Sequence, residues 1–172
     1  MLKALGLSAA ALLFTASAQA QDAKLNDAQI AHIAYTAGNI DIAAGRQALA
    51  KSKNKAVRAF AEEMVRDHAA VNDQALALLK KLGVAPQDSP TSQALSQEAA
   101  SQLNASAKLE GKAFDKAYVD NEIAYHKTVN GALAGSLIPD AQNAELKSLL
   151  KTGLKLFTEH QAHAEHLAAS AK

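Results

Sequence analysis

The sequence predicts an all-α protein: a four-helix bundle with an extra short helix in the long connection between its two hairpins. Alanine is abundant and β-branched residues are sparse, and no stretch alternates apolar and polar residues for long. Such a composition favours helix over strand almost throughout the chain. Helix-breaking signals occur at only a few positions, and they divide the chain into four long segments and one short one. No repeat of solenoid length is visible, which disfavours a stack of helical repeats.

The first twenty residues have the features of a secretory signal peptide. Lys3 precedes the apolar run 4–14, and Ala18-Gln19-Ala20 supplies the small residues that a signal peptidase recognises. The apolar run is too short to span a membrane as a helix. We therefore expect a single domain, residues 21–172, in the periplasm, with an uncleaved N-terminal anchor as the alternative. Because the chain has no cysteine, a lipid-anchored lipoprotein and thiolate metal ligands are both excluded.

The charge balance of the expected mature chain disfavours two classes of partner. Removing Lys3 with the signal peptide leaves 17 basic and 17 acidic residues. A neutral chain without a basic run is not typical of proteins that bind nucleic acid or anionic membranes. The mature form has no predicted membrane span. Its 152 residues are enough for one domain with a sizeable core.

Sequence signals at helix ends set the expected boundaries. Asn26-x-x-Gln29 resembles a capping box, Gly83 ends the second helix, and Ser89-Pro90 is typical of a helix start. Pro139 and Asp140 are expected to turn the chain between the last two helices. The predicted helices span about residues 26–51, 55–83, 91–108, 112–136 and 143–172.

Each long helix carries at least one ionisable residue on its apolar stripe, which is spaced alternately by four and three residues. The residues that interrupt the four stripes are Asp41, His68, Glu122, His126 and His160. Burying an unpaired carboxylate or imidazole costs several kcal/mol, so we expect these groups to meet one another or a cation. Imidazole and carboxylate are ordinary ligands of transition metals. The sequence therefore predicts a metal site from these five residues, with a metal-free hydrogen-bonded network as the rival interpretation.

The heights of these residues along the bundle axis do not decide which of them share one site. Counted from Pro139, His126 and His160 differ by about 12 Å in height, whereas Glu122 lies closer to the level of His160. The sequence does not decide whether His126 and His160 share one site. The run His160, His163 and His166 is not expected to form a three-histidine site, because its side chains fan round the helix.

Several of these residues also carry a family resemblance. Asp67-His68, the run FDKAY from Phe114, His126 and His160 together resemble a bacterial secreted family, domain of unknown function four-one-four-two, whose members are often labelled outer membrane proteins. The resemblance covers about residues 26–168. It implies a ferritin-like bundle, with a periplasmic location or association with the outer membrane. The family's histidines correspond to His68, His126 and His160, and its usual glutamate in the first helix is replaced here by Asp41.

The ligand pattern disfavours a carboxylate-bridged di-iron centre, which the ferritin-like fold would otherwise suggest. Such centres use two Glu-x-x-His motifs, but Val65, Ile123 and Phe157 stand three residues before the three histidines. A mononuclear site for zinc, copper or iron fits better, in a protein with a role in metal handling or envelope stress. The sequence identifies no reaction and favours a non-enzymatic protein. The alternative is a metal-free envelope protein with a buried His/Asp network and a protein-binding surface.

Overall fold

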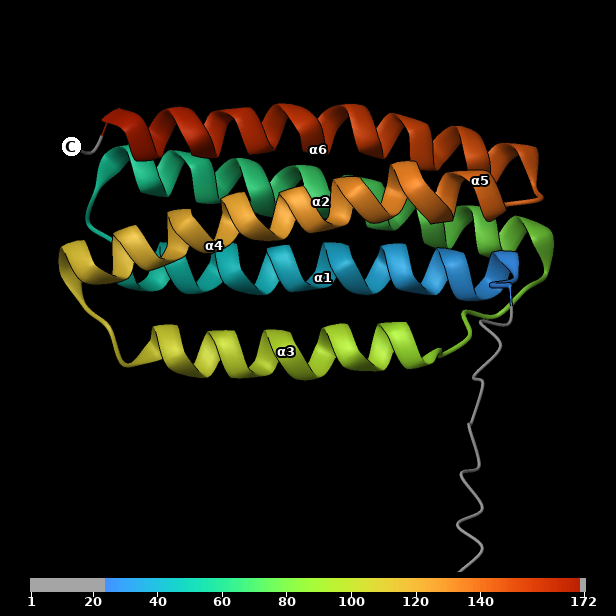
Figure 1. Ribbon diagram of the computed structural model, residues 1–172, viewed down its shortest axis with the longest axis horizontal. Helices are drawn as coiled ribbons and strands as arrows, with labels where there is room; N and C mark the ends of the chain where they lie inside the picture. Colours follow the sequence, from blue (N-terminus) through green and yellow to red (C-terminus); the bar gives the residue numbers. More distant parts are fainter. Residues whose placement is uncertain (1–23, 171–172) are drawn as a thin grey trace, which may run out of the picture.

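The computed structural model describes residues 24–170, and within this range the chain is helical and has no strand (Figure 1). The expected signal peptide, residues 1–20, lies outside the described range. The prediction of an all-α bundle with an extra short helix is confirmed. The elements are α1 (Asp27–Lys51), α2 (Lys55–Leu82), α3 (Pro90–Ala107), α4 (Gly111–Ala132), a π-helical turn η1 (Leu133–Leu137), α5 (Ile138–Asp140) and α6 (Ala144–Ser170).

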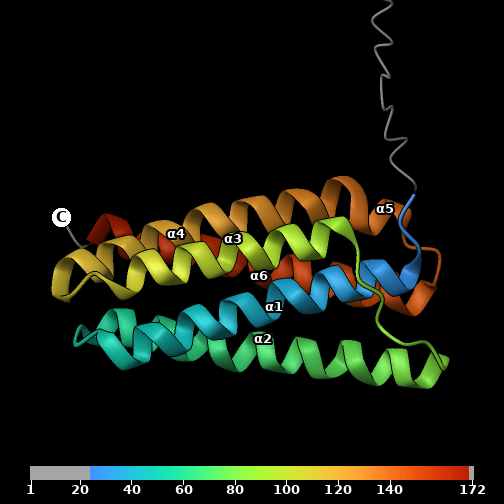
Figure 2. The ribbon, with the colours of Figure 1, turned by 90° about the horizontal axis from the view of Figure 1, so that it is seen from below.

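Two antiparallel hairpins, α1 with α2 and α4 with α6, pack side by side to form the bundle. Helix α2 lies against α6, and α1 lies against α4. The connection from α2 to α4 runs the length of the bundle and carries α3, which lies over α1 and α4 (Figure 2). Two hairpins joined by one long crossover connection are the topology of ferritin-like bundles.

The helix ends form where side chains satisfy the free backbone groups. At the start of α1 the Asn26 side chain accepts from the Gln29 N–H at 2.9 Å, and the Gln29 side chain accepts from the Asn26 N–H at 3.1 Å. Ser89 caps α3 in the same way, with Pro90 as the first helical residue. Helix α2 ends at Gly83, whose φ of 66° lies in the left-handed region that glycine adopts without strain. These three boundary predictions are confirmed.

The predicted turn at Pro139 is wrong. The chain stays helical to Asp140 and turns at residues 141–143. Just before the proline the helix widens into the π turn η1, in which the Ile138 N–H donates to the Leu133 carbonyl. Pro139 has no N–H to donate, and its ring would clash with the carbonyl four residues earlier in a regular α-helix. A π turn at this point displaces that carbonyl and lets the helix continue past the proline.

The core consists of two apolar clusters at opposite ends of the bundle. One cluster contains Ile30, Leu79, Leu133 and Phe157 among its members. The other contains Ala44, Met64, Phe114 and Ala164 among its members. Helices α1, α2 and α6 contribute buried residues to both clusters, and α4 continues into η1, whose Leu133 belongs to the first cluster. Each long helix therefore crosses the level that separates the two clusters.

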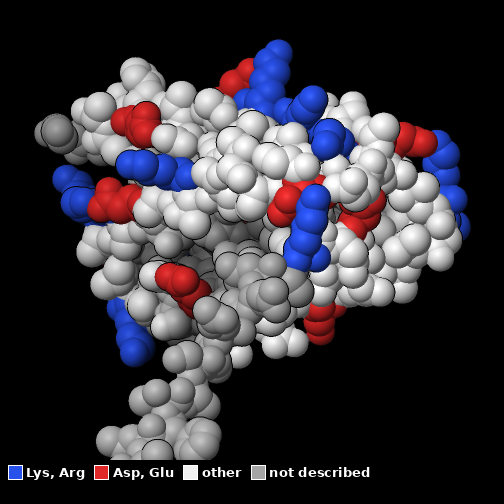
Figure 3. Space-filling view, turned by 45° about the vertical axis from the view of Figure 1, so that its right-hand side comes forward, with Lys and Arg blue, Asp and Glu red and all other residues white. Residues whose placement is uncertain are grey.

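The outer surface mixes both signs of charge. Figure 3 shows Lys and Arg side chains interspersed with Asp and Glu side chains on the face in view. Within residues 24–170, none of the helices combines the length and the apolar character that a membrane crossing needs.

Small residues on α1 allow α2 to approach closely. A Cβ atom added to Gly45 would lie 2.9 Å from Val65 Cγ2 and 3.0 Å from the backbone oxygen of Ala61. The backbone of α2 cannot move aside without disturbing the core, so Gly45 fixes how closely this hairpin packs.

We predict that Gly45→Ala lowers the free energy of unfolding by about 1–3 kcal/mol, because the methyl group overpacks the α1–α2 contact. Gly131→Ala is the matched control, since a Cβ there meets nothing within 4 Å. The control should gain about 0.5–1 kcal/mol from the better helix propensity of alanine. Urea unfolding of both variants measures the difference. Equal stabilisation of both variants would contradict the close packing described for Gly45.

Candidate metal centre

Five buried ionisable residues lie between the two apolar clusters, and we call them the polar layer: Asp41 on α1, His68 on α2, Glu122 and His126 on α4, and His160 on α6. Each is at most 2% exposed. Along every long helix the polar residue follows the members of one cluster and precedes those of the other. The alternation of four and three residues on each stripe points these side chains inward, as the sequence predicts.

The three histidines converge from three different helices. The ring centroids of His68 and His126 are 5.6 Å apart, those of His68 and His160 are 5.3 Å apart, and those of His126 and His160 are 5.6 Å apart. Each histidine offers one ring nitrogen such that the three nitrogens lie within 4.8 Å of one another. One ion placed among them could therefore reach all three side chains.

Hydrogen bonds hold two of these rings in place. His126 Nδ1 lies 3.0 Å from the Glu122 carbonyl oxygen, to which a protonated Nδ1 donates. His160 Nε2 lies 3.1 Å from Asp67 Oδ2, again with the ring nitrogen as donor. These bonds leave Nε2 of His126 and Nδ1 of His160 buried and without a partner. A ligand histidine that donates its other nitrogen to a carboxylate or a carbonyl is the usual arrangement around protein-bound metals.

His68 is positioned by packing alone. Its ring stacks on Phe157 with centroids 4.4 Å apart and an interplanar angle of 9°. Neither of its nitrogens has a hydrogen-bond partner, although Nε2 lies 3.5 Å from Asp41 Oδ2. A fully buried imidazole with two unpartnered nitrogens is rare in protein cores.

Two carboxyl groups adjoin the histidines on the side of α1 and α4. Asp41, Glu122 and His126 each offer an atom within 4.8 Å of the other two, so His126 belongs to both groups of potential ligands. Burial raises the pKa of Glu122 to about 8. Burial, followed by the nearby charge of Glu122, raises the pKa of Asp41 well above its ordinary value. Asp41 Oδ1 and both carboxyl oxygens of Glu122 lack hydrogen-bond partners.

Burial keeps the histidines in their neutral, ligand form. It lowers the pKa of His68 to about 2, assisted by the charges that His126 and His160 would carry. It lowers the pKa of His126 to about 4. Burial also lowers the pKa of His160, against the opposing effect of Asp67. Neutral imidazole is the form that coordinates a metal ion.

The structure settles the question that helix heights left open, because His126 and His160 lie together. Heights counted from Pro139 gave the wrong levels, because the chain does not turn at that residue. Measured from the observed ends of the helices, His126 lies 14 residues before Asp140 and His160 lies 16 residues after Ala144. These distances along the helices differ by only about 3 Å. Glu122, one turn further from the hairpin end, reaches the same layer.

Asp67 is a member of the site that does not lie on an apolar stripe. It precedes His68 by one residue, so it faces α6 rather than the core, and it holds His160 from outside. Arg66 lies 2.7 Å from its other carboxyl oxygen. Burial raises the pKa of Asp67, but the hydrogen bonds from Arg66 and His160 outweigh that effect and the net shift is downward. The carboxylate is therefore ionised when it accepts from His160.

The remaining histidines of the C-terminal run do not join the polar layer. His163 Nδ1 lies 2.7 Å from Glu63 Oε2, and its side chain is 44% exposed. His166 is exposed. Neither belongs to a group of potential metal ligands in the described part of the chain. Tyr118 on α4 has a buried hydroxyl that makes no hydrogen bond.

The burial of His68 predicts a pH dependence of stability in metal-free protein. The unfolded chain takes up a proton on His68 near pH 6.5, whereas the folded chain resists it until about pH 2. The stability contributed by neutral His68 is thus complete above about pH 6.5 and falls as the pH falls below it. Glu122 has the opposite effect on the free energy of unfolding. Because its pKa is raised to about 8, the neutral carboxyl group contributes stability at low pH that is lost as the pH rises through about 8.

We predict that, in the presence of chelator, the free energy of unfolding of the wild type relative to His68→Gln falls by about 2 kcal/mol between about pH 7 and about pH 5. Both chains keep Asp41 and Glu122, so the comparison isolates the histidine. Urea unfolding at the two pH values measures it, and His166→Gln at an exposed position is the control. A difference that does not change with pH would show that His68 takes up its proton as readily in the folded chain as in the unfolded one.

Comparisons with known proteins agree with this description of the fold. The model of a family described as a domain of unknown function, DUF4142, matches residues 13–167. A solved structure similar to this chain is that of a protein from Streptomyces coelicolor described as a secreted protein of DUF305. The TM-score is 0.72, with 12% sequence identity over 84% of this chain and 93% of the other. At this identity the likeness concerns the fold alone. No curated protein matches the chain.

Proposed function

This chain belongs to the DUF4142 family, whose function is unknown, and we propose that it binds one transition-metal ion in the polar layer. The three histidines supply nitrogen ligands from α2, α4 and α6. The carboxyl groups of Asp41 and Glu122 supply either a further ligand or a counter-charge beside the ion. The observation that carries the proposal is the convergence of three buried imidazoles whose facing nitrogens have no hydrogen-bond partner.

The unpartnered polar groups of the polar layer have an energetic cost that a bound cation would remove. A buried polar group without a hydrogen bond costs about 1–3 kcal/mol, and the polar layer contains several such groups at one level. A cation that accepts lone pairs from the histidines and balances the charge of a deprotonated carboxyl would remove most of that cost. The rival, a metal-free hydrogen-bonded network, would need bonds among these groups. His68 makes none, since its Nε2 lies 3.5 Å from Asp41 Oδ2.

The set of donors favours zinc, copper or iron in a mononuclear site. Imidazole nitrogens suit these metals, whereas calcium and magnesium prefer sites made of oxygen ligands. With three histidines and only two carboxyl groups, the polar layer is short of the four carboxylates of a ferritin-like di-iron centre. Because each ring of the ligand set comes from a different helix, the ion would also hold the hairpins together.

We further propose a location and a role. An expected signal peptide at residues 1–20 supports a protein of the periplasm. The buried site supports retention of a metal ion rather than its exchange with bulk solvent. Metal handling in the cell envelope, or protection of the envelope under metal stress, is the role that fits this combination.

The direct test is a metal titration of protein purified without a histidine tag and stripped by chelator. We expect one equivalent of zinc, copper or iron to bind and to raise the melting temperature, because the ion binds only the folded chain. His68→Ala should abolish the stoichiometric binding. His166→Ala at the exposed helix end is the matched control and should bind as the wild type does.

Two outcomes would contradict the proposal. One is that none of these metals binds or changes the melting temperature. The other is that His68→Ala binds the metal as well as His166→Ala does, which would place the ion outside the polar layer. A His68→Leu variant that is as stable as the metal-free wild type would show that the histidine is not required for folding. That result would leave metal binding as the reason for its presence.

Asp67 offers a second test, because it orients a ligand without touching the ion. We predict that Asp67→Asn keeps the metal stoichiometry but weakens the affinity about 10- to 100-fold, as the loss of other outer-shell carboxylates does. Competition with a chromophoric chelator measures the affinity. Asp73→Asn, at an exposed position on α2, is the control. Unchanged affinity in Asp67→Asn would show that the His160–Asp67 bond does not orient the ligand.

A further inference from the structure

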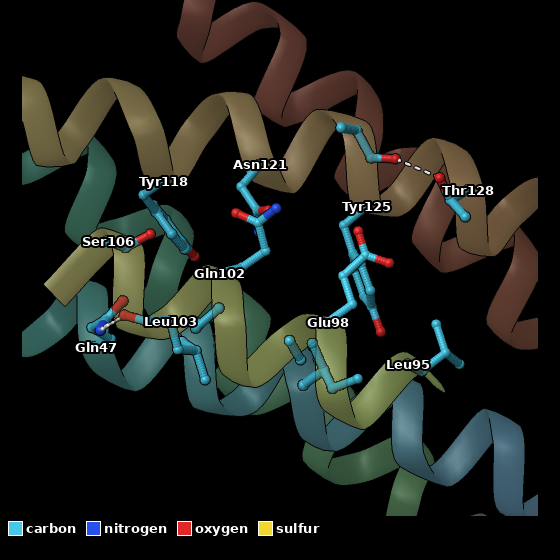
Figure 4. Close-up of a pocket in the computed structure, with 14 residues that line it drawn as sticks. Gln47, Leu95, Glu98, Gln102, Leu103, Ser106, Tyr118, Asn121, Tyr125 and Thr128 are labelled. Carbon is cyan, nitrogen blue, oxygen red and sulfur yellow. Dashed lines mark hydrogen bonds between the residues drawn. The ribbon is translucent and has the colours of Figure 1, made fainter. Parts of the chain in front are cut away.

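A second site lies outside the polar layer, in a cavity of about 190 Å³ between α1, α3 and α4. In Figure 4, Tyr118 and Tyr125 extend from α4 into the space between the helices, and Glu98 lies on α3 across from them. Ile40 and Ala44 on α1 form the floor. The metal proposal uses none of these residues.

Helix α3 is held over the cavity by polar contacts and by Leu95 and Leu103, which pack against the two apolar clusters. The Gln47 side chain donates to the Leu103 carbonyl at 3.0 Å, and the Lys51 ammonium donates to the Ala107 carbonyl at 3.0 Å. The one fully buried residue of α3 is Ser92, near its start. The helix therefore covers the α1–α4 groove without filling it, and the volume beneath it remains.

The lining joins apolar surface to unused hydrogen-bonding capacity. Leu95, Ala99 and Leu103 of α3 face Tyr118 and Tyr125 across the cavity. The Tyr118 residue is 4% exposed, and its hydroxyl has no partner. The Tyr125 hydroxyl donates to the Ala37 carbonyl at 3.2 Å, so its oxygen can still accept. Because the Tyr118 hydroxyl is closed off, Tyr118 offers the cavity its ring, and the hydrogen-bonding capacity on this side comes from the Tyr125 oxygen.

The charge around the cavity has one sign. Of the described residues that line it, only Glu98 is charged, and none is basic. Aromatic faces and a carboxylate attract cations, and nothing in the lining would balance an anion.

We propose that this cavity binds a small organic cation, an ammonium compound that carries a compact apolar group. The ammonium would lie between Glu98 and the tyrosine rings, donating to the Tyr125 oxygen. The apolar group would occupy the space along Leu95 and Ala99. The volume corresponds to about six water molecules at about 30 Å³ each, which limits the ligand to well below the size of most drug molecules.

A set of isosteric probes tests the charge preference. Benzylammonium, benzyl alcohol and benzoate have similar size but differ in charge, and titration calorimetry or ligand-observed NMR measures each of them. We expect benzylammonium to bind several-fold more tightly than benzyl alcohol and benzoate to bind most weakly. The same order should hold with chelator present and with metal added, because the cavity and the polar layer are separate sites. A failure of metal binding would thus leave this result unaffected.

Two pairs of variants locate the binding. Glu98→Gln should weaken benzylammonium about two- to fivefold, the effect of a partly exposed charge pair, while Glu165→Gln on α6 should not. Ala99→Leu should fill the cavity and reduce binding at least about tenfold, while Ala100→Leu on the exposed side of α3 should not. The proposal is overturned if no probe binds, if benzoate binds as well as benzylammonium, or if Ala99→Leu leaves binding unchanged.

Discussion

Taking an imidazole or a carboxyl group out of water costs several kcal/mol unless another partner replaces the water. This bundle buries five such groups at one level. Their position divides the core into two apolar clusters, and each helix must deliver its polar residue to the same height. The register of all four long helices is thereby specified, since a shift of one residue would expose a histidine or bury a surface charge.

Several local features of the chain help to fix this helix register. The capping boxes and Gly83 define where the helices begin and end. Gly45 sets the spacing of the first hairpin. The π turn before Pro139 adjusts the second hairpin, so that His126 and His160 meet. Because side chains outside the layer also hold the rings, as Asp67 and Phe157 do, the three imidazoles face one another before any ion arrives. Such preorganisation reduces the entropy that binding must overcome.

Much of this architecture could be predicted from the sequence, because the helix-end signals and the apolar stripes are local. The stripes identified all five members of the polar layer, since a polar residue on an apolar stripe is visible without coordinates. The relative height of His126 and His160 could not be predicted, because it depends on the π turn and on the length of the turn at residues 141–143. The cavity was missed as well. Its existence depends on where α3 docks, and few apolar side chains of α3 indicate this.

The central claim, that an ion bound by this protein is held by His68, His126 and His160, is tested most directly by anomalous diffraction from crystals loaded with zinc. We expect one strong anomalous peak at the centre of the bundle, within ordinary zinc–nitrogen distance, about 2.0–2.1 Å, of all three imidazoles. A peak confined to the surface pair His163 and Glu63, or the absence of any ordered peak, would contradict it.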